Sequence, residues 1–278
     1  MASHQKKLSL CFLSSGDVCQ KKIWSDFLSQ APPDRFSVYL HRSDGMSFTW
    51  IKGCTIIPHI PTAWGAFSLM RVQQELLKYA HADERNYKFL FLSGDSIPIH
   101  TFEVVYQRLI LDDDDGRCSK HPDYELPHIR LREIGFHKRH FISSLPFEFS
   151  RASQWVLLNR VHAELLFTHW DMLVKVFEDS HCPDEHVYPI FYKGMGVWHT
   201  FKQTPTIYVN FGLIQTRLCS LEHRIFPATY HFLYGKELDA IYTSGSMFMR
   251  KICPTAKIMT DWNLERPLLQ NEPHCSLL

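Results

Sequence analysis

The sequence lacks any long apolar run, because no stretch approaches the roughly 18 apolar residues that a membrane-spanning helix needs. The basic N-terminus is followed only by the short apolar run 8–13, without a cleavage site after it, so no secretory signal is predicted. The eight cysteines include no CxxC pair, which argues against a zinc knuckle or a thioredoxin-like site. We therefore expect a soluble, cytoplasmic chain with reduced thiols and no membrane span.

Several other features are missing. The 30 basic and 29 acidic residues nearly cancel, so charge gives no support to a nucleic-acid partner. No GxGxxG or GxxxxGK[ST] motif follows the first predicted strand, which disfavours a dinucleotide-binding site and a P-loop. The 17 histidines are scattered and form no HExxH motif, so we expect no metal among them.

Apolar residues make up 45% of the chain and aromatic residues 14%, enough for a large core. In the first half, apolar runs alternate with segments of helical periodicity, which predicts an α/β fold with a mostly parallel sheet flanked by helices. A polar stretch, 112–124, contains four consecutive aspartates; we interpret it as a solvated loop and not as a metal site. The expected strands are 8–13, 36–41, 54–57 and 87–92, and the expected helices are 23–28, 66–80, 102–111, 153–167 and 171–177.

In a sheet of this kind, ligands bind beyond the carboxyl ends of the strands. The polar segments 14–17, 41–45 and 93–96 each follow a predicted strand, so we expect them to face one crevice.

Six motifs occur in an order that resembles one family, the core-2/I-branching β-1,6-N-acetylglucosaminyltransferases, together with their peptide O-xylosyltransferase and plant branch-type relatives. The resemblance covers about residues 8–253. The motifs are KLSLCFLSSGDVCQKKIWSDFL at the start, Trp64-Gly65 with Arg71-Val72-Gln73, FLFLSGDSIPIHTFEVV at 89–105, Ser153-Gln154-Trp155 with Asn159-Arg160, Pro183-Asp184-Glu185, and Phe248-Met249-Arg250-Lys251.

The resemblance implies one GT-A-like domain over 1–278, with a nucleotide-sugar-binding half at 1–110 and an acceptor-binding and catalytic half at 111–278. The family's usual stem and membrane anchor are not seen in the sequence, and this compact form is similar to glycosyltransferases of large algal viruses, such as a chlorovirus xylosyltransferase. If the protein is viral, we expect it in the host cytoplasm.

By the same resemblance, Glu185 is the general base that takes a proton from the acceptor hydroxyl. From the residues alone, the first turn of a helix is the favoured interpretation of Pro183-Asp184-Glu185, and the resemblance favours the catalytic one. Lys251 matches the family's diphosphate-binding lysine and would replace a metal ion, since the usual metal position holds the single carboxylate of Asp95. The family's second, upstream arginine is missing near Ala228; Arg250, Arg224 and His231 are the candidates to replace it.

The remaining predicted site residues divide into two sets. The first set is expected, with Lys251, to surround the nucleotide sugar, and consists of Ser14, Asp17, His41, Trp64, Gly65, Arg71, Asp95 and Arg250. Arg71 is equally well explained as a surface residue of a helix. Glu103, Trp155 and Phe211 are expected to contact the acceptor, and the two aromatic residues are equally well explained as core residues.

The sequence thus predicts an inverting glycosyltransferase that needs no metal or other cofactor. Its partners would be a nucleotide sugar, UDP-xylose first and UDP-N-acetylglucosamine as the alternative, and an oligosaccharide or glycoprotein acceptor. Two other hypotheses stay open at this point. One is a non-catalytic carbohydrate-binding protein on the same fold, and the other is a metal-dependent transferase that uses Asp95.

Overall fold

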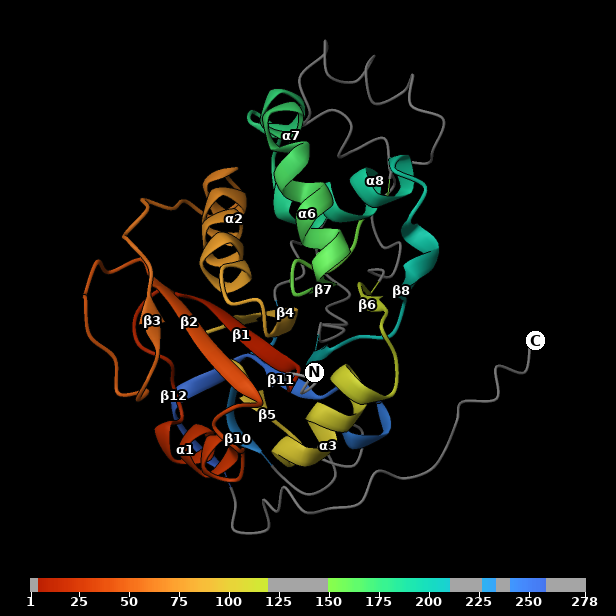
Figure 1. Ribbon diagram of the computed structural model, residues 1–278. Helices are drawn as coiled ribbons and strands as arrows, with labels where there is room; N and C mark the ends of the chain where they lie inside the picture. The colour runs from red at the N-terminus through yellow and green to blue at the C-terminus, as the bar shows by residue number, and fades with distance from the viewer. Residues whose placement is uncertain (1–4, 120–149, 211–226, 234–240, 259–278) are drawn as a thin grey trace, which may run out of the picture.

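The computed structural model describes residues 5–119, 150–210, 227–233 and 241–258. Its main sheet has seven strands in the order β3-β2-β1-β4-β7-β6-β8 (Figure 1). The first four of these pair in parallel, β7 is antiparallel to both of its neighbours, and β8 is parallel to β6. The predicted α/β class with a mostly parallel sheet is confirmed. The strands are β1 (Lys7–Ser14), β2 (Phe36–Arg42), β3 (Thr55–Ile56), β4 (Asn86–Ser93), β6 (Gly116–Arg117), β7 (Leu157–Asn159) and β8 (Phe201–Lys202).

The two central strands explain why the prediction succeeds. Every residue of β1 is buried, and in β4 only Tyr87 is partly exposed. Strands covered on both faces read as continuous apolar runs, and such runs were the signal used for 8–13 and 87–92. Two layers of helices must therefore cover the sheet.

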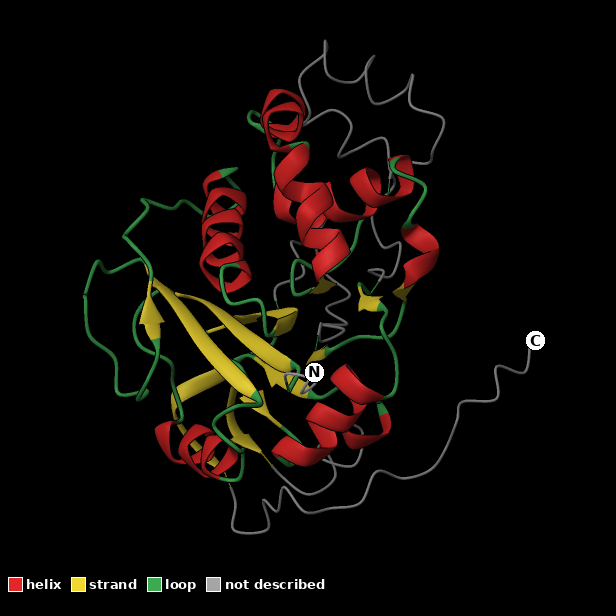
Figure 2. Cartoon of the chain, in the orientation of Figure 1, coloured by secondary structure: helices red, strands yellow, loops and turns green. Residues whose placement is uncertain are grey.

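Figures 1 and 2 show these two layers. The helix α2 contacts β1, β2 and β4 through a buried apolar stripe, and the helix α6 packs beside it. Opposite them, Trp24 of α1 and Phe102 of α3 extend an aromatic cluster that reaches β1 and β2. One layer contains α2 (Ser68–His81), α6 (Arg160–Thr168), α7 (Trp170–Phe177) and α8 (Val187–Gly194); the other contains α1 (Lys21–Ser29), α3 (Phe102–Tyr106) and the π-helix η1 (Gln107–Leu111).

A second, three-stranded sheet joins distant parts of the chain. Its strands are β5 (Ile97–Pro98), β11 (Phe248–Arg250) and β9 (Ile207–Val209), with β11 in the middle. The strands β10 (Tyr230–Leu233) and β12 (Ile252–Ile258) form a separate two-stranded sheet, and β12 begins directly after β11 in the chain. The strand β12 continues beyond Pro254 as far as Ile258. Because β11 pairs with β5, and Ile252 donates to the carbonyl oxygen of Asp95, residues 248–252 lie beside the loop that leaves β4.

The predicted helix 153–167 is wrong over its first part. Residues Leu157–Asn159 instead form β7 and pair with β4. The helix begins only at Arg160, where Asn159 and His162 form a capping box. Short apolar runs such as 156–158 do not distinguish a buried strand from a buried helix, and here pairing with β4 decides.

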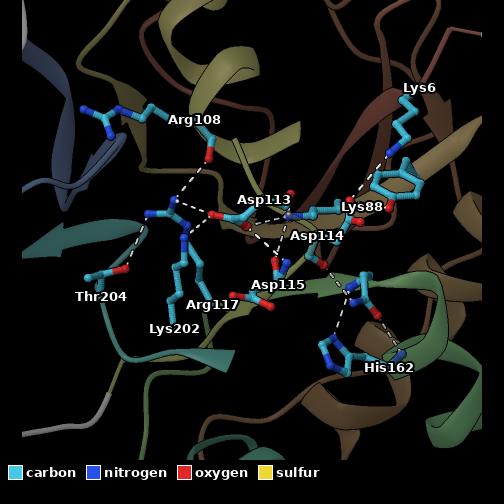
Figure 3. A network of polar contacts seen from close by, with 12 residues as sticks. Lys6, Lys88, Arg108, Asp113, Asp114, Asp115, Arg117, His162, Lys202 and Thr204 are labelled. Atoms are coloured by element: carbon cyan, nitrogen blue, oxygen red, sulfur yellow. Dashed lines mark hydrogen bonds and ion pairs between the residues drawn. The ribbon is translucent and has the colours of Figure 1, made fainter. Parts of the chain in front are cut away.

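The aspartate run is only partly the solvated loop that the sequence predicts, because Asp112 and Asp114 are exposed and Asp113 is not. The Asp113 side chain is only 12% exposed and faces the fully buried ammonium group of Lys88 (Figure 3). Lys88 Nζ donates to Asp113 Oδ1 at 3.1 Å and to the carbonyl oxygens of Asp113 at 2.9 Å and Asp115 at 2.7 Å. Lys202 and Arg117 also approach Asp113. The Asp113 carboxylate therefore neutralises the buried ammonium group of Lys88 on the central strand β4.

Protonation follows from this arrangement. Burial lowers the pKa of Lys88, and the charge of Asp113 only partly opposes that shift. Burial alone would raise the pKa of Asp113, but hydrogen bonds from Lys202 and Lys88 and their charges outweigh it, and its pKa is lowered. The network is thus built around an ionised Asp113.

Within the described ranges, no helix is long and apolar enough to cross a membrane, and the cysteines are free thiols. The proposed division at residue 110 into a nucleotide-sugar-binding half and an acceptor-binding half stays a prediction. Strand β7 joins the sheet beside β4, and Phe248 shares the main core with Leu8.

Candidate active site

The strands β1, β2 and β4 end at the same edge of the sheet, as the topology requires. Gly94 lies directly against β1: its amide donates to the carbonyl oxygen of Leu13 at 3.1 Å, and its carbonyl accepts from Cys19 at 2.8 Å. A Cβ on Gly94 would lie 1.8 Å from Ser14 Oγ, so only glycine permits this contact. Ser14 is thereby placed at the edge, buried against the loop that carries Asp95.

Arg250 and Asp95 meet at this edge although 155 residues separate them. Arg250 Nε lies 2.9 Å from Ser93 Oγ and 3.3 Å from Asp95 Oδ1, and Ser93 Oγ also donates to Asp95. The guanidinium carbon lies 4.7 Å from the centroid of the Trp155 ring, which is a cation–π contact. Arg250 is 12% exposed, so the candidate cation is held by side chains on two sides.

Lys251 is half-buried beside this pair. Burial lowers its pKa, the adjacent Arg250 lowers it further, and only Asp95 acts in the other direction. Two adjacent cations with a single carboxylate leave an excess of positive charge. A negatively charged ligand placed here would act against the lowering of the Lys251 pKa.

Two predicted residues at the edge chiefly order its loops. Asp17 accepts from Thr49 Oγ1 at 2.7 Å and lies 3.3 Å from a guanidinium nitrogen of the buried Arg42. His41 Nε2 lies 3.1 Å from the carbonyl oxygen and 3.2 Å from the amide nitrogen of Ile60, and burial lowers its pKa. Both therefore shape the edge through the loops after β2.

Glu185 lies on the short 3-10 helix η2 (Pro183–Glu185), which precedes α8. The helix-start interpretation is thus correct for the backbone, and it does not conflict with a catalytic role for the side chain. Arg151 Nε donates to Glu185 Oε2 at 2.7 Å, and the amide of Ala152 donates to the Glu185 carbonyl oxygen at 2.9 Å.

Trp64 and Gly65 are fastened to the segment that leads into η2. The amide of Cys182 donates to the Gly65 carbonyl oxygen at 2.8 Å. Gly65 has a φ of 71°, and a Cβ there would meet His181 at 2.9 Å, so both backbone angle and space favour glycine. The Trp64 ring stands edge-on to His181 and is 66% exposed. The Trp64 ring thus lies at the surface beside the segment that leads into η2.

Gln73 belongs to the Arg71-Val72-Gln73 motif, but it was not predicted as a site residue. It is 1% exposed, accepts from Tyr188 Oη at 2.6 Å, and donates to the Gln154 carbonyl oxygen at 3.3 Å. It thus ties the start of α8 to the segment that carries Trp155. The available signal was an amide on the otherwise apolar face of α2.

The segment 151–155 connects the two chemical centres. At one end Arg151 binds Glu185, and at the other the Trp155 ring lies against Arg250. Four residue steps span at most about 14 Å between the Cα atoms of Arg151 and Trp155, so one short segment contacts both the Glu185 carboxylate and the Arg250 guanidinium. This segment, Arg151 included, was not predicted as the link.

Other predicted residues are not brought to this edge. Glu103 pairs with Arg35 at 2.7 Å, immediately before β2 begins. With eight residues in β1, that position is roughly 25 Å from the opposite edge. Arg71 forms an exposed pair with Glu178 at 2.6 Å, which favours the surface interpretation. Phe211 and Arg224 lie outside the described residues.

His231 is exposed on β10, and no contact described for it involves Asp95 or Lys251. Of the three candidates for the missing arginine, Arg250 is thus the one that the described structure places at the edge.

Fold and geometry together define an α/β protein with a candidate ligand site beyond the carboxyl ends of its parallel strands, where the Asp95 carboxylate meets Arg250 beside Lys251. A family model described as the Core-2/I-branching enzyme matches residues 10–227, well over half of the 278-residue chain. The chain belongs to the Core-2/I-branching enzyme family. The resemblance noted in the sequence is confirmed at this level.

Individual relatives are distant. The rice (Oryza sativa subsp. japonica) protein "Glycosyltransferase BC10" is 22% identical over 184 residues, which cover 63% of this chain and 43% of the rice protein. The chain thus spans less than half the length of that relative. The similarity to enzymes of algal viruses stays a prediction.

Two solved structures are also similar. The apo structure of the bifunctional glycosyltransferase WbbM aligns with a TM-score of 0.42 and 8% identity, over 90% of this chain and 46% of that one. The apo form of mouse xyloside xylosyltransferase 1 aligns with a TM-score of 0.34 and 11% identity, over 73% and 88%. At these scores neither similarity supports an inference about activity.

Proposed function

We propose that this protein is an inverting glycosyltransferase that moves a sugar from a nucleotide diphosphate donor to a hydroxyl group of a glycan or glycoprotein. The observation that carries the proposal is the segment 151–155. Through contacts at its two ends, it links a candidate base, Glu185, to the cation Arg250, which is adjacent to Lys251. Family membership supports the same reaction class.

In this proposal, Glu185 accepts the proton as the acceptor O–H bond breaks. The oxygen forms a bond to the anomeric carbon of the sugar, and the bond between that carbon and the diphosphate oxygen breaks. The electron pair leaves with the diphosphate on the opposite face, so the configuration inverts. A base that is already in position before the reaction lowers the barrier, because its interaction with the moving proton is formed in the transition state and not in the ground state.

Arg250 and Lys251 receive the charge that develops on the leaving diphosphate. Asp95 and Ser93 hold the Arg250 guanidinium in place, and the Trp155 ring supports one of its faces. Asp95 would thus be an anchor for Arg250 and not a metal ligand. In the described part of the chain, no three His, Cys, Asp or Glu side chains gather as a metal site would require.

The donor proposed first is UDP-xylose, with UDP-N-acetylglucosamine as the alternative. The test is to incubate the purified protein with each UDP-sugar and measure released UDP, with and without oligosaccharide acceptors. UDP release that rises with acceptor supports transfer. Binding of glycans without turnover of any donor would favour the non-catalytic carbohydrate-binding alternative.

Lys251→Ala is expected to weaken UDP binding and to slow turnover. A charge-assisted contact of this type contributes about 1.5–3 kcal/mol, or roughly 10- to 150-fold in affinity. Turnover should fall as well, because the cation matters more as charge develops on the departing phosphate. UDP affinity by calorimetry and turnover by UDP release measure the two effects.

Arg250→Ala is the comparison. We expect a smaller loss than for Lys251→Ala, unless Arg250 takes the place of the missing upstream arginine, in which case both variants lose similarly. A Lys251→Ala protein that binds UDP and turns over like the wild type would place the diphosphate site elsewhere.

Activity is expected to persist in excess EDTA, because two cationic side chains would supply the charge that a metal ion provides in other transferases. The measurement is the transfer rate before and after chelation, followed by addition of Mn²⁺ or Mg²⁺. Complete loss that either ion restores would contradict this and would make Asp95 a metal ligand.

A further inference from the structure

The Glu185 carboxylate is held by a specific partner. Arg151 Nε donates to Glu185 Oε2 at 2.7 Å, with 26% of the Arg151 side chain and 19% of the Glu185 side chain exposed. An ion pair that is largely shielded from water is stronger than one on the open surface. We propose that Arg151 is a positioning residue for the base. It orients the Glu185 carboxylate, and it sets the pH below which that carboxylate is protonated and no longer acts as a base. The inference rests on the proposed function of Glu185.

The backbone around Arg151 is fixed, so its guanidinium approaches from a set direction. The neighbouring Ala152 amide donates to the Glu185 carbonyl oxygen at 2.9 Å. On the other side, Ser150 accepts at its hydroxyl from Lys193 Nζ at 2.8 Å, and its carbonyl lies 3.2 Å from His186 Nδ1. A catalytic group held by a rigid supporting shell is set up before the substrate binds.

Arg151 has two opposite effects on Glu185 as a base: it holds the carboxylate in position, and its positive charge lowers the basicity of that carboxylate. When the acceptor proton moves to Glu185, the carboxylate loses its charge and the attraction to Arg151 is lost. Arg151 therefore keeps Glu185 ionised down to a lower pH and also makes it a weaker base. Among the described residues, the other titratable or charged groups near Glu185 in the chain or on the helix that follows it are Asp184 and His186 on either side of it, His181 before η2, and Lys193 on α8.

Arg151→Met tests the proposal through the pH dependence of kcat/KM. With the guanidinium removed, the acid limb of the profile is expected to move up by about 1–2 pH units. Arg151→Lys keeps the charge, and its limb should stay close to that of the wild type. Arg35→Met is the matched control, because it removes a similarly shielded guanidinium from an Arg–Glu pair at the opposite edge of the sheet; its limb is expected not to move.

Several outcomes would overturn the inference. An Arg151→Met enzyme with the wild-type acid limb shows that Arg151 does not set the protonation of the base. UDP affinity reports whether the variant is folded; if it is not, Arg151→Gln, which retains a hydrogen-bond donor without the charge, gives the same test. If Glu185→Gln loses activity while Arg151→Met keeps the wild-type profile, this inference fails and the proposed function stands. If Glu185→Gln turns over normally, both fail.

Discussion

Replacing Glu185 with glutamine is expected to lower the transfer rate by about 10²–10⁴ while UDP affinity stays near that of the wild type. The amide has almost the same shape as the carboxylate, but it cannot accept the proton of the acceptor hydroxyl. It can still accept the hydrogen bond from Arg151 through its carbonyl oxygen, so η2 should keep its place. Single-turnover transfer from a UDP-sugar and calorimetric titration with UDP separate chemistry from binding.

Glu164→Gln is the control for this experiment. It makes the same chemical change on an exposed face of α6, where the Glu164 side chain is 60% exposed and lies 3.4 Å from His81 Nε2. Its transfer rate should be that of the wild type. A Glu185→Gln enzyme with near-normal turnover would remove Glu185 from the mechanism.

The largest expected effect on stability comes from Asp113→Asn. The change leaves the fully buried Lys88 cation without its carboxylate, and breaking a buried pair in this way costs about 3–5 kcal/mol in the free energy of unfolding. Asp114→Asn is the matched control in the same run: that side chain is 75% exposed, so its pair with Lys6 contributes only about 0–1 kcal/mol. Urea unfolding at pH 7 measures both variants.

The Asp113 effect should depend on pH in a defined direction. Its pKa is lowered in the folded protein, so its stabilisation is complete above the ordinary carboxyl value of 3.8 and is lost as pH falls toward the lower folded value. The wild type and Asp113→Asn should therefore converge in stability below about pH 4. Adding Lys88→Met to Asp113→Asn should restore part of the loss, because the uncompensated cation is removed. Equal stabilities of Asp113→Asn and Asp114→Asn at pH 7 would contradict this account of the network.

Much of the fold could be predicted from local patterns. The strands at 8–13, 36–41 and 87–92 agree with β1, β2 and β4 to within one residue at each end. These strands are buried on both faces and carry continuous apolar runs, so the local pattern reflects the tertiary environment. The stripe of α2 is similarly clear, because one face of the helix is buried over its whole length. Strand β7 was missed because three apolar residues fit either kind of element.

The candidate site was predictable in its chemistry and less so in its geometry. Glu185, Arg250 and Lys251 were identified through the family resemblance, and their roles stay predictions. Nothing in the local pattern indicated that Arg151 would contact Glu185 or that Trp155 would support Arg250, since those contacts join segments 34 and 95 residues apart. The resemblance also led to Glu103, which lies where the strands begin and not where they end.

The sequence by itself determined the alternation of strands and helices, and with it the edge of the sheet where ligands bind, because apolar periodicity and strand direction are local properties. Only the tertiary structure decided which charges meet. The Asp113 carboxylate turned inward because Lys88 lies buried on the central strand, and Arg250 reached Asp95 because β11 pairs with β5. Ion pairs and short strands depend on which segments lie side by side in space, and this cannot be predicted from the neighbouring residues in the chain.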